Sequence, residues 1–166
     1  MSTALIALGL ASSLMPVASA DDLVVDPAAP GPVQVASVPT SDNADPAAVA
    51  ACSQFATVLD GSSSYYGEFA DSFEGSSYAD PAVRTTNVTG RTALRESAAL
   101  AMKAADTPGL SPDIASPMRL WSLGATKLLM KMGLRMSGDD LNRTASEMNN
   151  EATKAQEACA AAGTHA

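Results

Sequence analysis

The sequence is poor in the side chains that most enzymes use for acid–base and metal chemistry. It has one histidine, His165, next to the last residue. Ser-His-Asp or Cys-His catalysis and histidine metal sites need an imidazole held in place by its surroundings, and we expect this end of the chain to be a frayed tail. Glycine-rich phosphate loops are also missing. We therefore expect a protein that is not an enzyme, with no catalytic residues, no metal site and no cofactor.

Basic residues are few as well. The chain has 10 Lys and Arg against 18 Asp and Glu, a formal net charge of −8, and no base precedes Arg84. Nucleic-acid affinity depends on clustered Lys and Arg. The composition thus argues against a nucleic-acid partner.

Long apolar runs are missing after the first residues of the chain. Residues 4–15 are mostly apolar but too few to cross a membrane, and Ala18-Ser19-Ala20 follows them, directly before Asp21. A short apolar run followed by small residues at positions −3 and −1 is typical of a secretory signal peptide. We predict a signal peptide over residues 1–20, cleavage after Ala20, and a mature protein without a transmembrane segment that is secreted or lies in the cell envelope.

Residues 21–44 are rich in alanine and contain four prolines. Dense proline interrupts helix and sheet hydrogen bonding and favours extended backbone. This segment is predicted to be a disordered linker, which serves either as a spacer through an envelope or as a leader without a function of its own.

The rest of the chain shows helical periodicity, with apolar residues in steps of three and four. Asp45-Pro46 is a helix start, because an aspartate caps the first turn and proline suits the first helical position. We expect helices over residues 46–74, 91–105 and 117–136, and a fourth that begins near residue 138. Glycine is unfavourable inside a helix, so we predict a kink or break near Gly61. Residues 75–88 are predicted to form a long connection. A short turn over 111–117 is predicted to precede the third helix. The prediction is an all-α, up-down four-helix bundle over residues 45–162, with a tail at 163–166.

Two cysteines test this topology. Cys52 lies in the first turns of the first predicted helix and Cys159 in the last turns of the fourth. An up-down bundle brings these turns to the same end, and an exported protein favours disulfides. We expect one disulfide, Cys52–Cys159, to close the bundle.

Basic residues recur on the third predicted helix. They are spaced by multiples of four, which gathers them into one stripe on the helix surface. The stripe predicts a site that docks an anionic envelope lipid or an acidic protein partner. The alternative is a solvated face that Asp60, Glu68 and Asp71 partly neutralise. The stripe consists of Arg119, Lys127, Lys131 and Arg135.

Aromatic residues make up only 4% of the chain, and six of the seven lie between Phe55 and Tyr78. The helix predicted to face them is mostly alanine, so large and small side chains can interlock as a core. Alternatively, the aromatic side chains line a slot for a small apolar ligand, with tyrosine hydroxyls at its mouth. The candidate pocket residues are Phe55, Tyr65, Tyr66, Phe69, Phe73 and Trp121.

The layout as a whole carries a family resemblance. A leader ending in Ala18-Ser19-Ala20, a Pro/Ala-rich segment and an Ala-rich helical domain with a cysteine near each end resemble small exported helical proteins of actinobacteria, mycobacteria especially. The resemblance implies an envelope or extracellular location and transfers no site residues. Some proteins of that group bind haem, for which this chain offers tyrosines but no internal histidine.

The sequence therefore predicts a secreted or envelope-associated, non-enzymatic module. Its partner would be a protein or an anionic envelope lipid. The alternative is a carrier of a small apolar ligand, lipid or haem-like, in a pocket beside the aromatic residues of the first helix.

Intact mass spectrometry of the exported protein tests the leader and the cysteines together. The chain should begin at Asp21, and its mass should be lower by the two hydrogens lost when Cys52 and Cys159 join. Two free thiols in protein recovered from the medium would contradict the disulfide and weaken the prediction for the order of helices.

Overall fold

The computed structural model describes residues 40–166, and the predicted signal peptide and most of the predicted linker lie outside this range. In the described part four helices follow one another and no strand occurs. They are α1 (Pro46–Phe73), α2 (Pro81–Ala105), α3 (Pro112–Gly133) and α4 (Gly138–Ala161).

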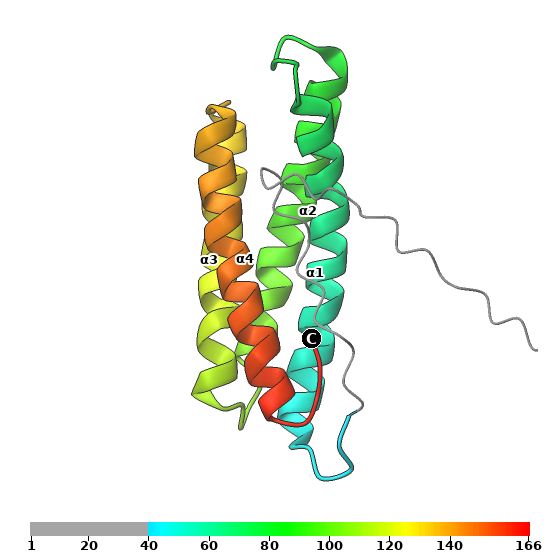
Figure 1. The fold of residues 1–166 in the computed structure, drawn as a ribbon, viewed down its shortest axis with the longest axis vertical. Helices are drawn as coiled ribbons and strands as arrows, with labels where there is room; N and C mark the ends of the chain where they lie inside the picture. The colour runs from blue at the N-terminus through cyan, green and yellow to red at the C-terminus, as the bar shows by residue number, and fades with distance from the viewer. Residues whose placement is uncertain (1–39) are drawn as a thin grey trace, which may run out of the picture.

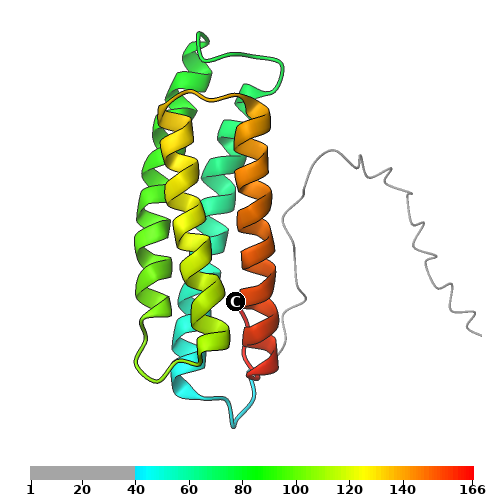
Figure 2. The ribbon, with the colours of Figure 1, turned by 90° about the vertical axis from the view of Figure 1, so that its left-hand side faces the viewer.

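The four helices form an up-down bundle in which each helix packs on the next one along the chain (Figure 1). Seen from the side of α3, α2 and α4 flank it and α1 lies behind (Figure 2). Of the four neighbouring pairs, α1 and α4 share the smallest contact. The predicted all-α four-helix bundle is confirmed.

Three helices begin with the same local device, a capping residue followed by proline. The capping side chains of Asp45, Asp80 and Ser111 each accept a hydrogen bond from the backbone N–H two residues later, over 2.7, 2.7 and 3.3 Å. Proline in the next position has no N–H to leave unsatisfied. This device sets the starts of α1, α2 and α3.

Two predicted helix starts are wrong. In both cases a capping residue and its proline lie inside a segment that is predicted to be a connection or a turn. The long connection over 75–88 does not exist: Asp80-Pro81 starts α2 ten residues before the predicted Arg91. Likewise α3 starts at Pro112, and Pro117 lies inside it as a buried residue. Proline there forgoes a single intrahelical hydrogen bond, and its ring packs in the core.

The predicted kink or break near Gly61 is not a break, since α1 runs as one helix from Pro46 to Phe73. A glycine costs about 1 kcal/mol relative to alanine inside a helix. Buried residues on both sides of it, Val58 and Ser62, hold α1 against its neighbours. Tertiary packing on α2 therefore outweighs the local weakness.

Helix α3 ends earlier than predicted, at Gly133, through a Schellman motif. The N–H of Met136 donates to the carbonyl of Lys131 (3.1 Å) and that of Arg135 to the carbonyl of Met132 (3.2 Å). Arg135 has a positive φ of 55°, a conformation that this motif usually assigns to glycine. Arg135 and Met136 therefore belong to the turn between α3 and α4.

The core runs the length of the bundle and combines large side chains with small ones. Its largest fully buried side chains include Phe55, Phe69, Leu94, Met118 and Leu128. The three helices α1, α2 and α3 meet at Gly90, where an added Cβ would lie 3.3 Å from Cε of Met132 and 3.4 Å from the carbonyl oxygen of Tyr65. Small residues on α2 thus permit close helix packing.

A disulfide and a backbone hydrogen bond hold together the end of the bundle where α1 begins and α4 ends. The predicted Cys52–Cys159 disulfide is confirmed, with the two Cα atoms 6.0 Å apart. After α4, Gly163 adopts a φ of 75° and accepts a hydrogen bond from the N–H of Ser41 (2.7 Å). Thr164 is 1% exposed. The expectation of a frayed tail is wrong, because residues 163–166 pack on the bundle, although His165 itself is exposed.

Replacing Arg135 with glycine should stabilise the protein. Arginine in the left-handed region costs about 1 kcal/mol that glycine does not, so Arg135→Gly should raise the free energy of unfolding by about that amount in urea titrations. Arg135→Ala is the matched control, because it removes the charge and keeps the strained conformation. An equal gain in both variants would show that charge, and not backbone strain, is the cause.

Candidate functional site

The six candidate pocket residues do not come together in one place. Phe55 packs edge-on against Trp121, with ring centroids 5.6 Å apart. Phe69 stacks on Phe73 (5.5 Å), about 20 Å further along α1 at 1.5 Å per residue. Tyr65 is 44% exposed and belongs to neither group. The aromatic rings of α1 therefore form two separate packing clusters.

The cluster that contains Phe69 and Phe73 closes the end of the bundle where the α1–α2 and α3–α4 connections lie. Tyr78, from the connection between α1 and α2, lies 4.8 Å from Phe73 between ring centroids. Its hydroxyl donates to the carbonyl of Met136 (3.3 Å), which ties this connection to the one between α3 and α4. Burial raises the pKa of Tyr66 to about 12 and also raises that of Tyr78. Both hydroxyls therefore keep their protons to a higher pH than an exposed tyrosine does.

Three of the four bases of the predicted stripe bind other residues of the bundle. Arg119 lies 2.8 Å from the carboxylate of Asp106 and Lys127 lies 2.7 Å from that of Glu147. Lys131 donates to the carbonyl of Asp140 (2.9 Å). The fourth member, Arg135, lies outside the helix, so the prediction of four bases on one helix surface is wrong at that position.

The carboxylates that neutralise these bases are not the predicted ones. Asp60, Glu68 and Asp71 lie on α1, diagonally across the bundle from α3 (Figure 2). The actual partners, Asp106 and Glu147, come from the α2–α3 turn and from α4. Helix order, which decides which surfaces are neighbours, assigns the charge pairs.

The feature that the sequence reasoning missed is an apolar stripe on the outer face of α3. Four of its large side chains are exposed: Leu120 51%, Leu123 58%, Met130 56% and Leu134, at the helix end, 76%. Together with Lys127 they recur in steps of three, four, three and four, the spacing of a coiled-coil seam. We call Leu120, Leu123, Lys127, Met130 and Leu134 the outer seam.

A signal for the outer seam is present in the sequence. The residues that α3 buries include Trp121, Ala125, Leu128 and Met132, and the seam repeats the same spacing on the opposite side of the helix. A helix that is assumed to have one apolar face is fully accounted for by the buried stripe, so the second stripe attracts no notice. Helix α3 is apolar on both faces, and only the fold shows which of the two is covered.

A hollow of about 320 Å³ adjoins the outer seam between α3 and α4. From α3 it is lined by Leu120, Leu123 and Gly124, and Met148 of α4 also contributes. An added Cβ at Gly124 would lie only 2.6 Å from Cγ of Met148. This glycine therefore lets α4 approach closely. The other lining residues are Lys127, Glu147, Asn150, Glu151 and Lys154.

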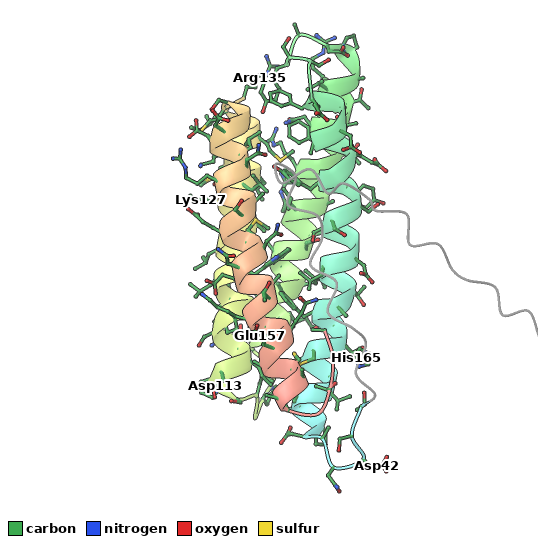
Figure 3. All side chains as sticks on the ribbon, viewed as in Figure 1. Asp42, Asp113, Lys127, Arg135, Glu157 and His165 are labelled. Atoms are coloured by element: carbon green, nitrogen blue, oxygen red, sulfur yellow. A yellow bond between two sulfur atoms is a disulfide. The ribbon has the colours of Figure 1, made fainter. Side chains whose placement is uncertain are left out.

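Charge is distributed unevenly across the bundle, although the hollow itself is lined by two bases and two acids. The pKa of Glu147 is lowered first by its hydrogen bond to Lys127 and further by the charges of Lys131 and Arg143. Helices α2 and α3 carry seven bases and two acids, whereas α1 and α4 carry eight acids and two bases. Lys127 lies on the outer side of the α3–α4 half (Figure 3). The outer seam thus belongs to the positively charged half of the bundle.

Within residues 40–166 no three His, Cys, Asp or Glu side chains lie close enough together to hold a metal ion. None of the helices in this range is long and apolar enough to cross a membrane.

Raising the pH should test the burial of Tyr66. The unfolded chain ionises this hydroxyl near pH 10, whereas the folded chain does so only near pH 12. Stability is therefore fully present below pH 10 and falls as the pH rises through this window, by no more than about 3 kcal/mol. Tyr66→Phe should lessen the loss in alkaline urea titrations, and exposed Tyr65→Phe is the control. An unchanged alkaline loss in Tyr66→Phe would contradict the burial of the hydroxyl.

The comparisons with known proteins concern the bundle as a whole. Neither a curated protein nor a solved structure matches the chain. The model of one family, described as the Rv2240c four-helix bundle domain, matches residues 35–160, a range that includes α1, α2, α3 and nearly all of α4. Its mycobacterial name agrees with the resemblance to mycobacterial helical proteins. The chain belongs to the Rv2240c four-helix bundle domain family.

Proposed function

We propose that the protein is an exported, non-enzymatic module that binds another macromolecule through the outer face of α3. The observation that carries this proposal is the outer seam, a line of exposed large apolar side chains opposite the helix's buried face. A helix that is apolar on all sides is normally covered on all sides. Contiguous exposed apolar patches on soluble proteins commonly mark interaction sites.

The proposed binding face is separate from the core. Leu120, Leu123 and Met130 are exposed while Trp121, Leu128 and Met132 are buried. Exposed side chains contribute little to folding, so their apolar character needs another reason. The hollow beside Gly124 adds a concave element, and concavity is typical of surfaces that receive a side chain from a partner.

Export is supported by the covalent link between α1 and α4. Structural disulfides persist in oxidising compartments and are rare in reducing ones, and Cys52 and Cys159 form such a link. Together with the predicted signal peptide over residues 1–20, this supports a location outside the cell or in its envelope.

Carriage of a small apolar ligand is the alternative proposal. Its predicted pocket residues pack against one another in two clusters, which favours the core interpretation of the aromatic residues. The hollow between α3 and α4 is about as large as the smallest ligand pockets, roughly 300 Å³, but charged side chains form its rim. We therefore place macromolecular binding first.

Site-specific photo-crosslinking in the exporting cells tests the proposed face. A benzophenone amino acid at Leu123 should yield discrete adducts, because this side chain would lie in the interface. The same group at Thr57, an exposed residue of α1, is the control and should yield none of them. Absence of adducts at Leu123, or the same adducts at both positions, would overturn the proposal.

A further inference from the structure

We infer that the outer seam binds an amphipathic α-helix of another protein, with acidic residues on the flank that faces α3. This inference rests on the proposed function and names the class of partner. The partner would lie along α3 as a fifth helix. Three observations carry it: the spacing of the seam, the hollow beside it and the charge around it.

The spacing fits a helix better than it fits an extended peptide. From Leu120 to Leu134 the seam alternates steps of three and four residues and spans about 20 Å at 1.5 Å per residue. Such a narrow line of side chains is what a second helix contacts when its own apolar residues have the same spacing. An extended chain, whose side chains alternate every two residues, would match few of these positions.

The hollow supplies a place for one apolar side chain of the partner. Leu120 and Leu123 form its α3 wall, and Met148 lies against Gly124. A residue that projects from the partner toward α4 could bury itself there without moving the backbone. Buried apolar anchors of this kind contribute much of the affinity of helix-in-groove interfaces.

The charge around the seam selects an acidic partner. Between Asp113 and Asp139 the chain has four bases and no acid. Lys127 and Lys131 have side chains on the α4 side of α3, and both act on Glu147, as does Arg143. Lys127 is paired with Glu147 and Arg143 with Asp140, whereas the ammonium of Lys131 binds only a backbone carbonyl. Among the described residues, the charge of Lys131 beside the seam therefore has no carboxylate partner. Carboxylates on the partner's flank would complement it.

Other occupants fit less well. Lys127 is the midpoint of the seam, so pairing two copies through α3, parallel or antiparallel, would place this lysine against its counterpart. For a lipid surface, Lys127 interrupts the apolar line, and the hollow beside it suits one projecting side chain better than a flat layer of headgroups. Both occupants are outcomes of the test below.

The test is a display library of helical peptides about three heptads long, selected against the disulfide-bonded mature chain. Leucine would fill the a and d positions, and the flanking positions would vary among Glu, Lys, Gln and Ser. We expect glutamate to be enriched on one flank. The best peptide is then synthesised and its affinity measured by fluorescence anisotropy.

Variants tie the binding to the outer seam. Leu123→Ser should weaken the peptide about tenfold or more, whereas Leu100→Ser, which removes an exposed leucine from α2, should leave the affinity unchanged. The double variant Lys127→Gln, Lys131→Gln should weaken the glutamate peptide and reduce its salt dependence. Circular dichroism should show the same helicity in all of these variants.

Four results would each overturn the inference. They are a selection that yields no binder or enriches lysine, affinity that Leu123→Ser does not change, binding to phosphatidylglycerol vesicles that Leu123→Ser abolishes, and a dimer by light scattering that the same variant dissociates. If adducts at Leu123 persist in cells while one of these results appears, the binding face stands and only the class of partner is rejected. Loss of the adducts would reject the proposed function itself.

Discussion

The closure of the bundle between its first and last helices is the constraint on which the other contacts depend. Helices α1 and α4 share the smallest contact of the four neighbouring pairs, and the Cys52–Cys159 disulfide joins these two. The two cysteines are 107 residues apart in the chain. A disulfide that closes a loop of this length stabilises a fold by up to about 4.7 kcal/mol in the chain-entropy model. The Ser41 to Gly163 hydrogen bond adds a backbone tie at the same end. With its first and last helices joined, the bundle holds α3 at the far side from α1.

That position leaves α3 with two apolar faces, one buried and one exposed. Its inner face, with Trp121 and Leu128, fills the core, while its outer face presents Leu123 and Met130 to solvent. Side chains on the outer face can change with little effect on stability, because they lose few contacts when replaced. A binding surface built on a rigid helix is also held in a defined geometry before it meets a partner, which lowers the entropy cost of binding.

Sequence reasoning succeeded where a local signal and the fold agree. Asp45-Pro46 starts α1, and Cys52 and Cys159 meet as the helix order requires. The sequence prediction is wrong where a helix-start signal lies inside a predicted loop: Asp80-Pro81 falls in the predicted connection over 75–88, and Ser111-Pro112 in the predicted turn over 111–117. The predicted helix over 117–136 includes Arg135, because nothing in the identity of arginine marks a left-handed turn. The outer seam cannot be recognised from the sequence alone, because a second apolar stripe looks like part of a core until the core is known.

The sequence by itself determined that the chain is helical, because steps of three and four apolar residues bury a face only in a helix. It also determined the number of helices, and it placed two cysteines where an up-down order brings them together. Only the tertiary structure decided that α1 continues through Gly61, that Asp106 and Glu147 pair with the bases of α3, and which face of α3 is covered. Each of these depends on which surfaces become neighbours, and neighbours far apart in the chain are set by the packing of all four helices at once.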